Sequence, residues 1–216
     1  MVCRWPKLQV VAFGITLACG MLAAQSRRIE DLAAGKLLVM EGQQGDRLFA
    51  ESVILLIHYD KDGVVGLRLN LPSEVPLSRL REVKGTGKRS DPAYFGGPLG
   101  IDEVTALVRA ASAPRDSIHV TADLYAVQTK RSLEAALKAS KGPADLRVYF
   151  GYCGWVIPQL QNEVTRGSWY ILDHGERFAF DSEPETLWKR LLELTNVRLA
   201  VAPAAEVRQR MHGARI

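Results

Sequence analysis

The feature that most constrains the fold is an unbroken apolar run at residues 52–59, Ser-Val-Ile-Leu-Leu-Ile-His-Tyr. A short run rich in β-branched and aliphatic side chains predicts a strand that is buried on both faces. Asp62-Gly63 follows the run, and this pair supplies the positive φ that a tight hairpin turn needs. Residues 64–69 then return as the partner strand, and Pro72 ends it because proline cannot donate to a ladder. We therefore expect a hairpin whose first strand lies in the core.

The rest of the chain alternates between short apolar runs and amphipathic stretches. Strands are expected at residues 36–40, 93–95, 104–109, 117–120, 146–151 and 169–173, with an edge strand at 197–201. Helices are expected over residues 77–83, over 130–140 after an N-cap at Thr129, over 158–166 and from Pro184 onward. Because hairpins come first and helices are interspersed later, the pattern favours a mixed α+β domain over a regular βαβ winding.

The N-terminal segment, residues 1–26, is predicted to be a secretory signal peptide or an uncleaved signal-anchor. Arg4 and Lys7 precede an apolar run at residues 8–24, and small side chains follow near its end. A positive head, an apolar middle and a small-residue exit are typical of export signals. This predicts a protein that is exported to the periplasm or anchored in the membrane. A start at Met21 is the alternative, and it would give a cytoplasmic protein.

The remaining chain suits one domain over residues 27–201, followed by a loose or weakly helical tail at 202–216. Arg4 and Lys7 supply two of the four net positive charges, so the domain itself is nearly neutral. A near-neutral domain gives little electrostatic support for nucleic-acid binding, and membrane contact is expected only through the N-terminal segment.

No metal or cofactor site is predicted. Two of the three cysteines lie in the N-terminal segment, which leaves Cys153, and the sequence has no Cys-x-x-Cys pair. The four histidines are scattered without the spacing of metal ligands. Cys153 is a conceivable nucleophile, but Trp155 stands where an acyl-hydrolase elbow needs glycine. A buried cysteine that packs as a small apolar side chain is favoured, and a thiol-dependent hydrolase stays as an alternative.

Three separated motifs suggest a family. They are Gly-Val-Val-Gly-Leu-Arg-Leu-Asn at residues 63–70, Gly-Gly-Pro at 96–98, and Gly-Tyr-Cys-Gly-Trp at 151–155 with Gly-Ser-Trp at 167–169. In this order they resemble the signatures of the YqgE/AlgH family. The resemblance implies a bacterial α+β fold, a single domain of coiled, bifurcated mixed β-sheets flanked by helices. Some members are labelled transcriptional regulators, and no catalytic residues come with the resemblance.

The motifs also define a candidate interaction surface, because loops on a rigid sheet are where function is usually presented. Its residues are Asn70, Gly96, Gly97, Pro98, Gly151, Trp155, Gln159 and Glu163. Gln159 and Glu163 are one helical turn apart and form the most plausible polar cluster. The alternative is that Gln159 ties down a 151–155 loop while Glu163 is solvated. No catalytic residue is predicted.

These observations favour a non-enzymatic protein of the YqgE/AlgH type whose biochemical role is not established. We expect a binding, interaction or regulatory protein at the bacterial cell envelope, with an unknown protein or small ligand as its partner. A cytoplasmic transcriptional regulator that starts at Met21 is the alternative, although nucleic-acid binding has little support in the sequence.

Overall fold

The expected core hairpin is formed by β3 (Val53–Asp60) and β4 (Gly63–Arg68). The structure is a computed structural model that describes residues 25–26, 28–42, 47–80 and 83–201. The first five residues of β3 are buried, because the strand is covered on both faces as its apolar run predicts. The expected signal segment up to residue 24 and the tail 202–216 lie outside the described residues.

The other strands and helices follow in chain order. The strands are β1 (Gln25–Ser26), β2 (Leu37–Met40), β5 (Pro72–Pro76), β6 (Pro92–Phe95), β7 (Leu99–Arg109), β8 (Ser117–Thr121), β9 (Leu124–Val127), β10 (Leu146–Trp155) and β11 (Trp169–Leu172). The α-helices are α1 (Lys130–Ala139), α2 (Ile157–Thr165) and α3 (Pro184–Val201). Short 3-10 turns lie at η1 (Ile29–Asp31), η2 (Arg47–Phe49), η3 (Leu77–Arg79) and η4 (Gly175–Arg177). Among the described residues, no helix is both long and apolar enough to cross a membrane.

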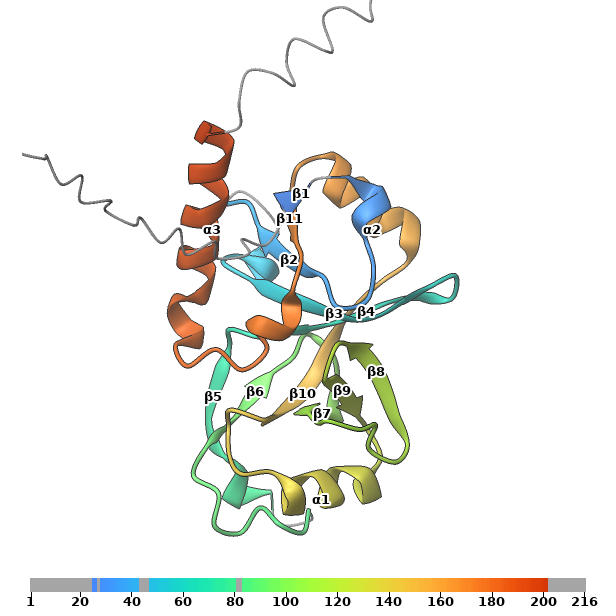
Figure 1. The fold of residues 1–216 in the computed structure, drawn as a ribbon, viewed down its shortest axis with the longest axis vertical. Helices are drawn as coiled ribbons and strands as arrows, with labels where there is room; N and C mark the ends of the chain where they lie inside the picture. The colour runs from blue at the N-terminus through green and yellow to red at the C-terminus, as the bar shows by residue number, and fades with distance from the viewer. Residues whose placement is uncertain (1–24, 27, 43–46, 81–82, 202–216) are drawn as a thin grey trace, which may run out of the picture.

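One continuous sheet joins the strands in the order β1-β11-β2-β3-β4-β10-β7-β9-β8, and β6 and β5 branch from β10. The pairs are antiparallel except for β6 and β10, which run parallel, so the sheet is mixed. The long strand β10 serves both halves of the molecule, as Figure 1 shows. Its N-terminal half pairs with β6 and β7, and its last three residues pair with β4. This branching confirms the expected α+β fold with coiled, bifurcated sheets.

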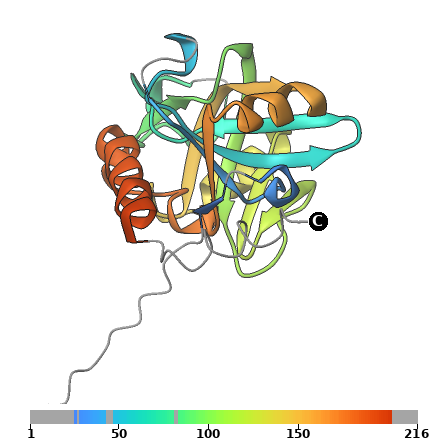
Figure 2. The same ribbon diagram turned by 90° about the horizontal axis from the view of Figure 1, so that it is seen from above.

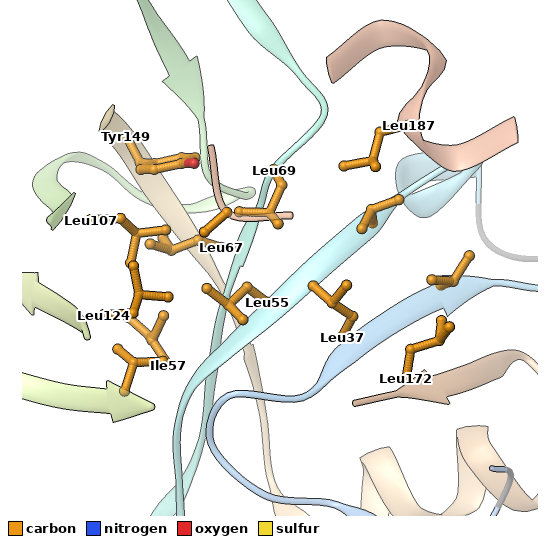
Figure 3. Packing of buried hydrophobic residues seen from close by; sticks show 14 of the residues in the cluster. Leu37, Leu55, Ile57, Leu67, Leu69, Leu107, Leu124, Tyr149, Leu172 and Leu187 are labelled. Atoms are coloured by element: carbon orange, nitrogen blue, oxygen red, sulfur yellow. The ribbon is translucent and has the colours of Figure 1, made fainter. Parts of the chain in front are cut away.

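The helices cover different parts of the sheet (Figures 1 and 2). Leu187 and Leu191 of α3 pack on the face that includes Leu37 and Leu55, and Figure 3 shows part of this cluster. The other face of β2 and β3 is covered by α2, and α1 covers the β7–β10 region. Truncating a fully buried leucine such as Leu55 to alanine is expected to cost about 2–5 kcal/mol, because a cavity remains.

Five features of the fold differ from the expectation. Residues 197–201 are the end of α3 and not an edge strand, because no glycine or proline interrupts the chain between Pro184 and Pro203. A single 3-10 turn replaces the expected helix over 77–83. The chain after Pro72 continues as β5, and β9 was not expected at all. The Gly151–Trp155 motif is the last half of β10 and not a loop.

Candidate functional site

The sheet forks at the Gly-Gly-Pro turn between β6 and β7. Gly96 lies between the two branches, because its N–H donates to the carbonyl of Phe150 (2.8 Å) and its own carbonyl accepts from the N–H of Arg68 (2.9 Å). A Cβ on Gly97 would lie 2.2 Å from the carbonyl carbon of Tyr152. Two backbones therefore touch here with no room for a side chain, and the glycines are required by packing.

Next to this turn, β7 bulges away from β10. Between the flanking paired positions, β10 contributes Gly151 alone, whereas β7 contributes residues 100–103. Bulges re-aim side chains at the rim of a sheet, and here Ile101 is 67% exposed. Leu99 (45%) and Phe95 (48%) are also exposed on the two sides of the turn. We call residues 95–101 the fork segment.

Behind the fork, the carboxylate of Glu163 on α2 joins two strands. Its Oε2 accepts hydrogen bonds from the indole N–H groups of Trp155 (3.2 Å) and Trp169 (2.8 Å). Its Oε1 accepts from the amide of Gln159 (3.0 Å). The ring of Phe49 packs against both indoles at 6.0 Å. The alternative with a solvated Glu163 is therefore wrong, since Gln159 bonds to Glu163 and the carboxylate anchors α2 to β10 and β11.

The side chain of Asn70 is hydrogen-bonded to the backbone at the start of β3. Its side-chain oxygen accepts from the N–H of Val53 (2.9 Å), and its amide donates to the carbonyl of Glu51 (2.8 Å). Glu51 has a φ of 54°, a conformation that is costly for a residue with a Cβ. The Asn70 side chain thus stabilises the strained entry into β3, and it is only 8% exposed.

The residues of the predicted interaction surface differ in accessibility. Pro98 and Gln159 are exposed, Gly97 and Glu163 are intermediate, and Asn70, Gly96, Gly151 and Trp155 are buried. The structure brings the three glycines together at the fork, whereas Gln159 and Glu163 lie behind Trp155 on α2. The three glycines therefore shape the fork, and only Pro98 and Gln159 of the predicted surface are exposed.

Cys153 lies inside the core below the fork. It is fully buried, and its thiol donates to the carbonyl of Gly96 (3.3 Å). Burial raises the pKa of Cys153 to about 12, although the charge of Arg68 acts in the opposite direction. Since the thiolate is the nucleophilic form of cysteine, this environment does not favour a reactive thiol.

The described residues contain no group of three or more His, Cys, Asp or Glu side chains placed to hold a metal ion. His58 pairs with Asp60 (3.0 Å) and His174 with Glu176 (3.4 Å), at two separate positions near the surface. Each is an isolated pair, and neither is joined to the fork by a contact that the structure shows.

The arrangement of motifs can be compared with known proteins. The AlgH-like family model matches residues 37–200, which include the hairpin, the fork and the Glu163 cluster. The chain belongs to the AlgH-like family. This confirms the resemblance that the three glycine-containing motifs indicated.

Relatives of this AlgH-like chain are found in several bacteria. A UPF0301 protein of Cytophaga hutchinsonii is 31% identical over 163 residues, which cover 74% of this chain and 88% of the relative. A UPF0301 protein of Chlorobaculum parvum is 30% identical over 162 residues, covering 74% and 86%. The solution structure of the AlgH protein from Pseudomonas aeruginosa matches with a TM-score of 0.59 at 21% identity, covering 84% of this chain and 93% of that one. That likeness is one of fold.

Sequence reasoning missed the exposed side chains of the AlgH-like fork. No motif includes Phe95, Leu99 or Ile101. Large apolar residues in or beside a strand are more often buried than exposed, so the sequence did not predict their exposure. Only the bulge opposite Gly151 places Ile101 outside, and no local pattern predicts a bulge of that size.

Proposed function

We propose that this AlgH-like chain is a non-enzymatic binding protein that recruits a protein partner through the fork segment. The observation that carries the proposal is the exposure of Ile101 on the β7 bulge, with Leu99 and Phe95 exposed nearby. Exposed apolar groups that a rigid scaffold holds in place are typical of protein-interaction sites. The buried glycine contacts of the fork supply that rigidity.

The proposal places the protein at the bacterial envelope. Its support is the charge and hydropathy pattern of residues 1–26, which has the positive head and apolar middle of an export signal. The buried Cys153 argues against the thiol-dependent hydrolase. The alternative is a cytoplasmic regulator that starts at Met21. The two alternatives predict different N-terminal residues for the native protein and different cellular fractions.

Site-specific photocrosslinking in living cells tests the partner. A benzophenone amino acid at position 101 should give a reproducible adduct of defined mass, and Leu99→Ser should abolish it. The same probe at Ile118, an exposed isoleucine on β8, is the matched control and should not give that adduct. Equal adducts from both positions, or none from position 101, would refute a partner site at the fork.

Localisation is tested independently of the partner. N-terminal sequencing of the native protein after cell fractionation should find the chain in periplasmic or membrane fractions. Recovery in the cytoplasm with Met21 as the first residue would contradict the envelope part of the proposal, while leaving the fork open to test.

A further inference from the structure

A pocket of about 510 Å³ lies between α1 and the connection from β7 to β8, outside the fork and its surroundings. This volume falls in the range of roughly 300–1,000 Å³ that is usual for small-molecule sites. One wall is α1, and the other is formed by residues 110–116. None of the motifs lies at this pocket, and the proposed partner site does not include it.

The walls of the pocket are largely apolar and built from small side chains. Val108 and Ala136 are buried at its base, and Ala135 and Ala139 lie on the accessible side of α1. The alanines leave space between the helix and the loop, because their side chains end at Cβ. Such a surface accommodates the apolar body of a ligand.

Two arginines at the pocket form no ion pair with any residue that the structure describes. Arg131, in the first turn of α1, and Arg115, in the loop, are exposed and lack a salt bridge to any described carboxylate. By contrast, the guanidinium of Arg109 is bound by Asp123 (3.1 Å) and by the carbonyl of Glu176 (2.7 Å). Arg115 and Arg131 are therefore available to an anion.

The acidic groups of the pocket compensate this positive charge only in part. The carboxylate of Asp145 is held by the Ser140 hydroxyl (2.6 Å) and by the N–H groups of Lys141 (3.0 Å) and Gly142 (3.2 Å), so its oxygens already have donors. Asp116, in the loop, is the other carboxylate of the lining. The lining thus combines three guanidinium groups with two carboxylates and keeps a net positive charge.

The first turn of α1 supplies a second, independent indication. It contains Lys130 and Arg131 and no acidic residue, although acidic side chains are the ones that stabilise a helix N-terminus. Of the two cations, Arg131 lines the pocket, so its guanidinium and the positive end of the helix dipole lie at the same end of α1. An anion bound there would offset the repulsion between them.

We infer that this pocket binds a small amphiphilic anion, whose carboxylate or phosphate group pairs with Arg115 and Arg131 while its apolar body packs on Val108 and the alanines of α1. The proposal goes beyond the proposed protein partner and uses other residues. It requires both parts of the ligand, because the pocket lining combines small apolar side chains with the guanidinium groups of Arg115 and Arg131.

The experiment measures the binding of four probes to the full-length protein by ligand-observed NMR. The probes are octanoate, octyl phosphate, octanol and inorganic phosphate, each below the concentration at which it aggregates. At least one of the two amphiphilic anions should bind about tenfold more tightly than octanol and than inorganic phosphate, a difference typical of one well-placed charged contact. The better of the two identifies the headgroup.

Three variants locate the site. The double variant R115Q/R131Q should weaken binding of the better anion by about tenfold or more. Ala135→Phe should fill the pocket and abolish binding, while circular dichroism checks that the domain stays folded. Lys138→Gln removes an exposed cation from the same helix at a position outside the pocket lining, and it should leave binding unchanged.

Three results would overturn the inference. The first is octanol or inorganic phosphate binding as tightly as the amphiphilic anions. The second is unchanged binding in R115Q/R131Q. The third is the absence of binding by both amphiphilic anions up to about 10 mM, a concentration at which even a weak site is partly filled. None of these results bears on the crosslinking test at position 101, because the two sites share no residue.

Discussion

The indole of Trp169 donates a 2.8 Å hydrogen bond to the same carboxylate oxygen of Glu163 that accepts from Trp155. The two tryptophans stand on different strands, and their rings meet edge to face at 6.3 Å. One carboxylate on α2 thus fixes the position of β10 relative to β11. The Trp-containing motifs at 151–155 and 167–169 and the glutamate between them form one structural unit.

Glu163→Ala is expected to lower the free energy of unfolding by about 2 kcal/mol, because two largely buried indole N–H groups lose their acceptor. Glu163→Gln keeps an acceptor oxygen and should cost less. Gln159→Ala, which removes only an exposed amide, should change stability by less than about 0.5 kcal/mol. Urea denaturation of the three variants measures these differences. Equal effects of E163A and Q159A would contradict the anchoring role.

Gly97→Ala should prevent folding or destabilise the domain by more than about 3 kcal/mol, since its Cβ would meet the β10 backbone at 2.2 Å. The matched control is Gly87→Ala, because a Cβ there has no atom within 4 Å. G87A should remain within about 0.5 kcal/mol of the parent chain. Thermal unfolding followed by circular dichroism distinguishes the two. A stable, fully folded G97A variant would show that the fork is not closely packed.

Cys153 should resist alkylation in the folded protein. Iodoacetamide at neutral pH reacts with the thiolate, and a buried thiol whose pKa is raised to about 12 forms little of it. Peptide-resolved mass spectrometry should find Cys153 unmodified without denaturant and fully modified in urea. Rapid labelling of Cys153 in the native chain would revive the thiol-dependent hydrolase.

Stability should fall as the pH rises above about 9. Burial raises the pKa of Cys153 to about 12, and it also raises the pKa values of Tyr149 and Tyr94 above the usual tyrosine range. In this pH range the unfolded chain releases protons that the folded chain keeps, so higher pH favours unfolding. Urea midpoints measured from pH 7 to 11 test the slope. Cys153→Ala should make the decline less steep, and an unchanged slope would contradict the assignment.

Arg131→Glu should stabilise the ligand-free protein by about 0.5 kcal/mol, because an acidic residue replaces a cation at the N-terminus of α1. The same change at the other end of the helix, Lys138→Glu, should be destabilising, since cations suit a helix C-terminus. If urea denaturation shows changes of opposite sign in the free energy of unfolding of the two variants, Arg131 lowers the stability of α1. Equal signs would remove the dipole argument.

The elements with a clear local pattern were predictable from the sequence. The hairpin followed from the apolar run and Asp62-Gly63, and the N-cap of α1 followed from Thr129, whose side chain accepts from the N–H of Ser132 (3.2 Å). The family followed from the glycine motifs. Each of these signals is contained within a few neighbouring residues.

The features that depend on distant neighbours were not predictable. A loop was expected at 151–155 after the strand at 146–151, because glycine usually interrupts strands. In the fold, the strand continues through Gly151 to Trp155. Gly151 has a φ of 66°, and a Cβ there would lie 2.5 Å from the carbonyl oxygen of Gly97. The reason for the glycine is thus more than fifty positions away in the chain. The pocket at α1 is likewise made by segments that no local motif connects.

The late position of β10 in the chain has a consequence during synthesis. In the sheet, β4 pairs with β10 on the side away from β3, and β2 pairs with β11 on the side away from β3. The ribosome makes β10 and β11 long after the β3–β4 hairpin. At a translation rate of about 5–20 residues per second, the hairpin emerges several seconds before either partner exists. During that time, β2 and β4 each lack the strand that pairs with one of their edges. Unpaired strand edges of this kind template pairing with other chains, so the nascent protein is expected to be prone to aggregation until β10 and β11 are made.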